Sequence, residues 1–202
     1  MIDNFDLIEP LLDFSDPDYF YFVQLLQRKK DFQENSKVSG TSNNSRLIKA
    51  YYVKSKEHLD FIKPEIMELC KLFNARAGIN LNKRSWEQTA LQHLKLVTDN
   101  IINKNYDKVY KTYSSAAGKF SHDNDKKWII DIDESGLLGR EKCKNILYAI
   151  HDIEPIGSKH ILTVPSKNGF HLITSAFNRQ QFSKMGFRED IQTNNPTNIF
   201  IP

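Results

Sequence analysis

The sequence predicts a mixed α/β protein in two parts, and two patterns support this. In residues 1–127, runs with apolar residues at three- and four-residue steps, which predict helices, alternate with short apolar runs, which predict strands. In residues 128–202, the predicted order is strand, helix, strand, strand, strand. We therefore expect an N-terminal α/β unit with a leading helix over 1–127, and a second unit over 128–202 that shares its core.

The elements of the first half follow from start signals and apolar spacing. Residues 15–18 form a helix-start cluster before the aromatic run 19–26, so a leading helix is predicted there, with the cations of 28–30 near its C-terminal end. Strands are predicted over 47–53 and 77–81. A helix begins near Leu59 and carries Pro64 in its first turns, and Ser85 caps the next helix.

The second half has clearer signals. Residues 128–133 form an apolar strand that ends in acids, and 141–150 form the helix that follows. Two further strands, 161–164 and 170–177, flank a turn that contains Asn168-Gly169, a strong hairpin signal. A last short strand is predicted over 198–201.

Composition narrows the class of protein. Hydrophobic residues make up 40% of the 202 residues and charged residues 26%, as in ordinary globular proteins. No basic, apolar leader and no apolar run of membrane-spanning length is present, so we expect a cytoplasmic protein without a membrane partner. Cys70 and Cys143 are the two cysteines, which fits a reducing compartment and excludes a zinc site built mainly on cysteine. The net charge of +3 is compatible with nucleic acid but does not establish it.

Two carboxylates stand at the end of the strand over 128–133. Because side chains alternate, Asp131 and Asp133 share one face, about 7 Å apart along the backbone, while Ile130 and Ile132 share the other. Paired acids at the end of an apolar strand repel each other unless water or a cation neutralises them. Hard oxygen ligands of this kind suit Mg²⁺ or Mn²⁺. A solvated strand end is the alternative interpretation of Asp131 and Asp133.

The hairpin adds a histidine to the same face. If Phe170 and Leu172 join the core under the helices, His171 stands on the open face beside the acids. The turn before it contains Ser166 and Gly169, and its backbone N–H groups and hydroxyl are suited to phosphate oxygens. Taken alone, His171 also fits a structural role.

Together these residues resemble a known family. Ile129-Ile130-Asp131-Ile132-Asp133, followed by Pro165-Ser166-Lys167-Asn168-Gly169-Phe170-His171, is similar to the motifs of archaeo-eukaryotic-type primases, including small phage and plasmid primase-polymerases. The similarity covers residues 128–202, and the first half matches only as a general α/β unit. It implies that 128–202 is an RRM-like βαβββ catalytic unit.

The resemblance also implies roles for individual residues. Asp131 and Asp133 would hold Mg²⁺ or Mn²⁺ with a third acid, for which Asp190 is the best candidate and Glu189 the alternative. His171 would contact the phosphates of the incoming nucleotide together with the turn residues Ser166, Lys167 and Gly169.

The activity implied is metal-dependent nucleotidyl transfer in the replication of phage, plasmid or mobile-element DNA. Its partners would be a single-stranded template and nucleoside triphosphates, and a helicase is a further partner that the resemblance suggests. Two other functions stay open: a non-catalytic nucleic-acid-binding replication accessory protein, and a metal-dependent nuclease.

Basic and aromatic residues of the first half offer candidates for template contact. Arg76 and Arg84 flank the strand predicted over 77–81 and could reach phosphates from one face, with solvated surface as the alternative. Tyr106, Tyr110 and Tyr113 recur at helical spacing, which is more typical of packing than of a base-stacking platform.

Overall fold

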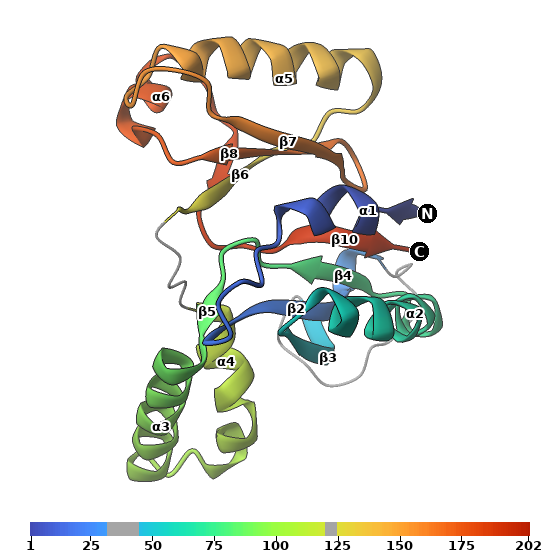
Figure 1. Ribbon diagram of the computed structural model, residues 1–202, viewed down its shortest axis with the longest axis vertical. Helices are drawn as coiled ribbons and strands as arrows, with labels where there is room; N and C mark the ends of the chain where they lie inside the picture. Colours follow the sequence, from blue (N-terminus) through green and yellow to red (C-terminus); the bar gives the residue numbers. More distant parts are fainter. Residues whose placement is uncertain (32–44, 120–124) are drawn as a thin grey trace.

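The computed structural model describes residues 1–31, 45–119 and 125–202, and it contains two antiparallel sheets (Figure 1). The chain is a mixed α/β protein. The first sheet has six strands, in which β10 lies between β1 and β4, β2 lies between β4 and β3, and β5 pairs with one end of β2. Its strands are β1 (Ile2–Asp3), β2 (Tyr19–Arg28), β3 (Ser45–Val53), β4 (Arg76–Ile79), β5 (Arg84–Ser85) and β10 (Thr197–Ile201).

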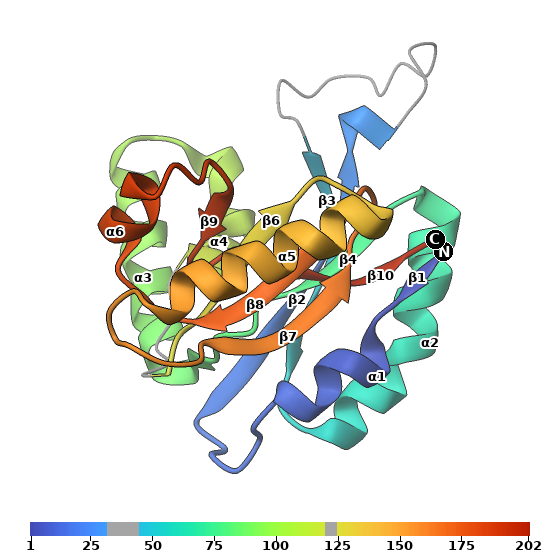
Figure 2. The ribbon, with the colours of Figure 1, turned by 90° about the horizontal axis from the view of Figure 1, so that it is seen from above.

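The second sheet has four strands in the order β7-β8-β6-β9. Helix α5 runs along its outer face, with α6 beside it (Figures 1 and 2). A core of apolar residues from β6, β8, α5 and α6 fills the space between them. The elements of this part are β6 (Lys127–Ile132), α5 (Gly136–His151), β7 (His160–Pro165), β8 (Phe170–Ser175), α6 (Arg179–Lys184) and β9 (Asp190–Gln192).

Helices cover both faces of the six-stranded sheet. Helices α1 and α2 lie on one side, and α3 and α4 lie on the other, below the four-stranded sheet in Figure 1. Short 3-10 helices η1, η2 and η3 connect these elements. The bounds are α1 (Phe5–Ile8), η1 (Glu9–Leu11), η2 (Lys29–Asp31), α2 (Lys56–Phe73), α3 (Trp86–Ile102), η3 (Tyr106–Lys111) and α4 (Thr112–Lys119).

The leading helix predicted over 19–26 is wrong, because this segment is strand β2. Tyr21, Val23 and Leu25 point into the core under α2, whereas Phe20 and Phe22 point into the smaller core beside α4. Both faces of β2 are therefore buried, and a strand of that kind is apolar without alternation. Its apolar run has no period that separates it from a buried helix.

Other predicted elements of the first half are confirmed. Strands form at 45–53 and 76–79, and the side chain of Ser85 accepts a hydrogen bond from the N–H of Gln88 at the start of α3. Helix α2 begins at Lys56, where Ser55 caps it, so Pro64 lies in the middle of the helix and not in its first turns. The missing N–H of Pro64 removes one hydrogen bond of that helix.

The last predicted strand forms, but it belongs to the first sheet. Residues 197–201 make up β10, which pairs with β1 on one side and with β4 on the other. The chain thus crosses from the four-stranded sheet to the six-stranded sheet between β9 and β10. This crossing is what brings the two sheets together around the predicted site.

Among the described residues, no helix has the length and apolar character required to cross a membrane.

Candidate active site

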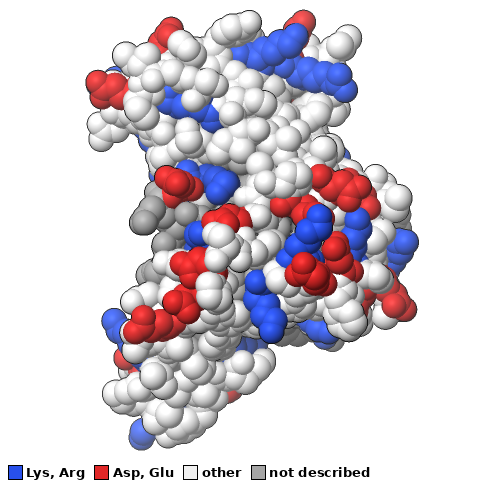
Figure 3. Space-filling view, viewed as in Figure 1, with Lys and Arg blue, Asp and Glu red and all other residues white. Residues whose placement is uncertain are grey.

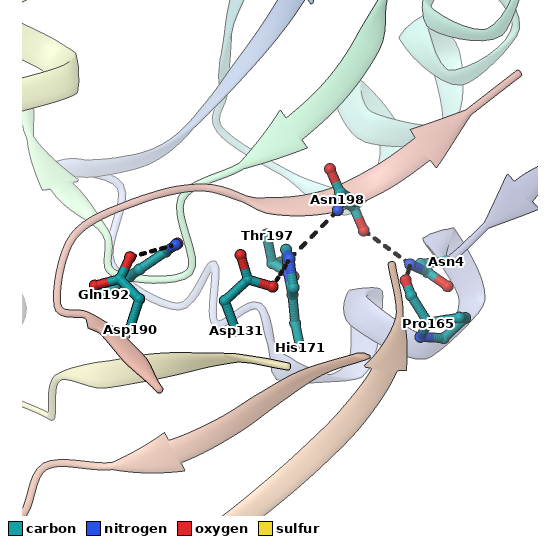
Figure 4. A network of polar contacts seen from close by, with 8 residues as sticks. All are labelled: Asn4, Asp131, Pro165, His171, Asp190, Gln192, Thr197 and Asn198. Carbon is teal, nitrogen blue, oxygen red and sulfur yellow. Dashed lines mark hydrogen bonds and ion pairs between the residues drawn. The ribbon is translucent and has the colours of Figure 1, made fainter. Parts of the chain in front are cut away.

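Three of the predicted site residues lie side by side across three strands. In the antiparallel register, Asp131 of β6 is opposite His171 of β8 and also opposite Asp190 of β9. Directly opposed residues of antiparallel strands project from the same face of a sheet. Figure 4 shows these side chains on the face of the four-stranded sheet that looks towards β10.

The predicted faces of β6 and β8 follow the same rule. Ile130, Ile132 and Leu172 pack in the core beneath α5, and Phe170 packs against that core, as the alternation predicts. Ile173 lies two residues after His171 and therefore on the same face of β8. It packs in the larger core, together with residues of the six-stranded sheet. The second face of the four-stranded sheet is therefore an interface between the two sheets.

His171 does not stand on an open face, and this expectation is corrected. Its side chain is buried, because β10 covers the face from which it projects. Nδ1 lies 2.9 Å from the hydroxyl of Thr197, and Nε2 lies 3.5 Å from Oδ1 of Asp131. The ring is thus held between β10 and the first acid of the motif.

The charge of His171 is set by this burial. Burial, together with the positive charges of Arg28 and Arg76, lowers the pKa of His171 to about 4, and the negative charge of Asp133 opposes this shift only in part. At neutral pH the ring is therefore uncharged. A neutral imidazole has one donor and one acceptor nitrogen. Nε2 lies 3.5 Å from Oδ1 of Asp131 and also 3.5 Å from Nδ2 of Asn198, so it can donate to the carboxylate in one tautomer or accept from the amide in the other.

Two glycines hold the chain close around the end of the Asp-x-Asp motif. A β-carbon at Gly169 would lie 1.9 Å from the carbonyl oxygen of Ile132, and one at Gly139 would lie 1.9 Å from that of Glu134. No side chain fits at either distance. The hairpin turn and the first turns of α5 can therefore approach Asp133 only because both positions are glycine.

The two candidates for the third acid have different surroundings. Asp190 is exposed, lies beside Asp131 and accepts a hydrogen bond from Nε2 of Gln192 at 3.0 Å. Glu189 is bound instead to Lys142 of α5, with 2.9 Å between Nζ and Oε1. Burial alone would raise the pKa of Glu189, but hydrogen bonds from Lys142 and the backbone lower it overall. Of the two, Asp190 lies with the predicted site.

The turn residues of the hairpin are placed at the contact between the sheets. The N–H of Ser166 donates to the carbonyl of Gly169 at 2.8 Å and closes the turn, so this N–H is used within the hairpin. Nζ of Lys167 lies 2.7 Å from Oδ1 of Asp31, at the end of η2. Lys167 therefore joins the hairpin to the six-stranded sheet.

Asp31 is the centre of a charged group that the sequence analysis did not identify. Its carboxylate pairs with Arg76 as well as with Lys167, and its side chain is almost fully buried. Burial would raise the pKa of Asp31, but the hydrogen bonds from the two cations lower it overall. Arg28 lies close enough to Arg76, Asp31 and Asp131 for their charges to affect its own pKa, which burial lowers. The sequence next to Asp31 does not indicate an ion pair, because both partners of its carboxylate come from distant segments, β4 and the hairpin.

The role suggested for Arg84 in phosphate contact is not supported by its position. Arg84 is fully buried, with Nε bound to the carbonyl of Ala117 and Nη2 to Oδ1 of Asn194. It also donates to the carbonyl of Asn82. Arg84 is therefore a structural residue that joins β5, α4 and the segment before β10.

Charges on the face drawn in Figure 3 alternate in sign. Over α1 and α2, acidic and basic side chains lie next to one another, and ion pairs join Lys63 to Asp6 and Lys56 to Glu9. That face is not a basic surface, in keeping with the small net charge.

The acids at the site are suited to a hard divalent cation whose remaining ligands are water molecules and substrate phosphates. The side chain of Asp131 is 29% exposed, and Asp133 and Asp190 are exposed. Within residues 1–31, 45–119 and 125–202, no three His, Cys, Asp or Glu side chains form a preformed metal cluster. Mg²⁺ is commonly bound by one or two carboxylates together with water and substrate phosphates. The donor set fits that kind of site.

Comparison with family models, with curated proteins and with solved structures finds no match for this chain. The functional argument therefore rests on the geometry of these residues.

Proposed function

We propose that this chain is a metal-dependent nucleotidyltransferase of the primase-polymerase type, acting in the replication of phage, plasmid or mobile-element DNA. The observation that carries the proposal is the row of Asp131, His171 and Asp190 across three neighbouring strands. These residues are up to 59 positions apart in the sequence, and the Asp-x-Asp motif and the hairpin motif meet at the 3.5 Å contact between Asp131 and His171.

The arrangement of the second sheet supports an RRM-like catalytic unit. Along the chain, β6, α5, β7, β8, α6 and β9 follow as strand, helix, strand, strand, helix, strand. In the sheet, β8 lies between β6 and β7, so the βαβ unit is split by an antiparallel strand. Helix α6, absent from the expected βαβββ order, completes the second half of this pattern.

In the proposed reaction, Asp131, Asp133 and Asp190 would hold Mg²⁺ or Mn²⁺. Such a cation neutralises charge on a triphosphate and helps to activate the attacking hydroxyl. His171 acts on this site as a positioning residue, because it is buried and contacts Asp131. This contact restricts the orientations that the Asp131 carboxylate can take.

The cations nearby are suited to the phosphates of a nucleoside triphosphate. Arg28, Arg76 and Lys167 outnumber Asp31, the acid with which two of them pair. An excess of positive charge at a partly exposed site attracts an anion. We expect the triphosphate to lie between this group and the acids of β6.

The proposal is tested by incubation of the purified chain with labelled nucleotide, a single-stranded template and Mg²⁺ or Mn²⁺. Asp131→Asn and Asp133→Asn are expected to abolish incorporation, because each removes a negative charge at the motif. Asp152→Asn is the matched control, since Asp152 is an exposed acid that follows the far end of α5. Unchanged incorporation in both motif variants would contradict the proposal.

A second function, that of a non-catalytic nucleic-acid-binding protein, is favoured by one observation. His171, to which the resemblance assigns contact with the incoming nucleotide, is buried against Thr197 of β10 and is therefore not exposed to a substrate phosphate. The same assay separates the possibilities: binding of the template without incorporation supports the accessory function, and shortening of the template supports the nuclease.

A further inference from the structure

A pocket of about 860 Å³ lies on the α4 side of the six-stranded sheet, formed by β2, β3, η3, α4 and the segment before β10. Its volume is within the range of sites that bind small molecules or single nucleotides. None of the residues assigned to the proposed reaction lines it. It is therefore a separate place on the molecule, and the function described above does not account for it.

The polar side of the pocket is held in a fixed arrangement. Nδ2 of Asn80 donates to the carbonyl of Asn194 at 2.6 Å, and Nε2 of Gln24 lies 3.4 Å from Oδ1 of Asn80. Asn194 is held in turn by the buried guanidinium of Arg84. These contacts hold the polar wall of the pocket in one arrangement, so a ligand would meet a preformed surface.

The charged residues of the pocket are all basic. Arg46 of β3 and Lys111 of η3 line it, and its described lining contains no Asp or Glu. Both cations are exposed, and neither forms an ion pair with another residue in the described part of the chain. A ligand that carries negative charge would therefore meet attraction without repulsion from the lining.

Tyr110 adds an aromatic surface to the pocket. It lines the pocket and is 78% exposed, and Nζ of Lys111 lies 5.0 Å from the centre of its ring. Tyr113, by contrast, packs edge to face against Tyr52, with 5.2 Å between ring centres. Of the tyrosines at helical spacing, Tyr110 is thus available for stacking, and a nucleic-acid base is a flat group of matching size.

The pocket and the candidate active site share one segment of chain. Asn194 and Pro196 line the pocket, while Thr197 and Asn198, which follow directly, contact His171. The pocket and the candidate active site are therefore bordered by consecutive residues of one segment.

We infer that this pocket binds single-stranded nucleic acid, with Tyr110 stacking on a base and Arg46 and Lys111 contacting phosphates. The role of the bound strand as a template rests on the proposed function, but the binding itself does not.

The test is fluorescence anisotropy of a labelled oligothymidylate with the full chain and a chelator of divalent cations, so that no catalysis occurs. Tyr110→Ala is expected to weaken binding about tenfold, the loss typical of one stacked base. Lys111→Gln is expected to weaken binding and to reduce the slope of log affinity against log salt by about 0.7. Tyr106→Ala and Lys108→Gln are the matched controls, because both residues are exposed on η3 outside the pocket lining.

The inference is overturned if Tyr110→Ala binds like the unaltered chain, or if Tyr106→Ala weakens binding as strongly. Displacement of the oligonucleotide by an equal concentration of free nucleoside triphosphate would also overturn it, because it would show a mononucleotide site. If the unaltered chain incorporates no nucleotide but Tyr110→Ala loses binding of the oligonucleotide, the proposed function fails and the pocket assignment stands. If the unaltered chain incorporates nucleotide and Tyr110→Ala binds the oligonucleotide normally, the proposed function stands and the pocket assignment fails.

Discussion

The polar contacts around Arg84 and those around His171 both connect the six-stranded sheet to the four-stranded sheet. The two groups differ in how many of their buried polar atoms have hydrogen-bond partners. Arg84 directs its guanidinium to oxygens of Ala117, Asn82 and Asn194. Asn82 then bonds the backbone of Lys127, where β6 begins, with 2.6 Å between the N–H nitrogen and Oδ1. This network is saturated by the protein itself.

The group around His171 is less complete. Nε of Arg76 and Oδ2 of Asp31 are buried and have no hydrogen-bond partner among the described residues. The ring of His171 is kept neutral in a region that also holds Arg28 and Arg76. Buried polar groups are normally satisfied, and exceptions gather at functional sites. The Arg84 network is thus complete within the protein, whereas the group around His171 contains buried polar atoms to which the proposed ligand would be a partner.

The largest effect is expected from Arg84→Met. This change leaves three buried oxygens without their donor, and we expect the free energy of unfolding to fall by about 4 kcal/mol. Urea denaturation measures this value, with Arg140→Met on the exposed surface of α5 as the control. Equal stability of the two variants would show that the Arg84 network is not the main polar connection between the sheets.

The next effect concerns pH and His171. The folded pKa is about 4 and the unfolded value about 6.5, so between them the unfolded chain binds a proton that the native chain does not. Stability is therefore lost as the pH falls through this window, by about 3 kcal/mol at pH 4. Unfolding curves at several pH values should show that His171→Gln loses this component and that His160→Gln, at an exposed position, keeps it. An identical pH dependence in His171→Gln would contradict the buried, neutral state.

A smaller loss is expected from Gly169→Ala. The added methyl group overlaps the carbonyl oxygen of Ile132, so the hairpin turn must shift away from β6, at a cost of about 2 kcal/mol. Thermal denaturation measures the loss. In the control Gly118→Ala, the added carbon would lie no closer than 3.5 Å to its neighbours, and little change is expected. If both variants melt alike, the close contact between the hairpin and β6 is not as tight as described.

The face of each residue in β6 and β8 could be predicted from the sequence, but not what covers that face. Alternation placed Asp131 and His171 together, and the Asn-Gly turn predicted the hairpin. The burial of His171 depends on β10, which is 26 positions away at Thr197 and pairs in the other sheet. Local patterns carry no information on such a contact.

Two further failures have the same origin. The segment 19–26 was predicted as a helix because a strand buried on both faces has no alternation to detect. Asp31 was not identified, because its role is created by Arg76 and Lys167, which are 45 and 136 positions away. Propensity and spacing describe neighbours along the chain, whereas these residues acquire their environment from distant segments.

The place of β10 has a consequence for biosynthesis. This strand lies between β1 and β4 and also supplies Thr197 to the ring of His171, so a nascent chain that has not reached residue 197 lacks both. Until the ribosome has added that segment, β1 lacks β10 as its partner strand, and the ring of His171 lacks the hydroxyl of Thr197 as its hydrogen-bond partner. The candidate active site is therefore expected to assemble only after residue 197 has been added, when β1 and β10 pair.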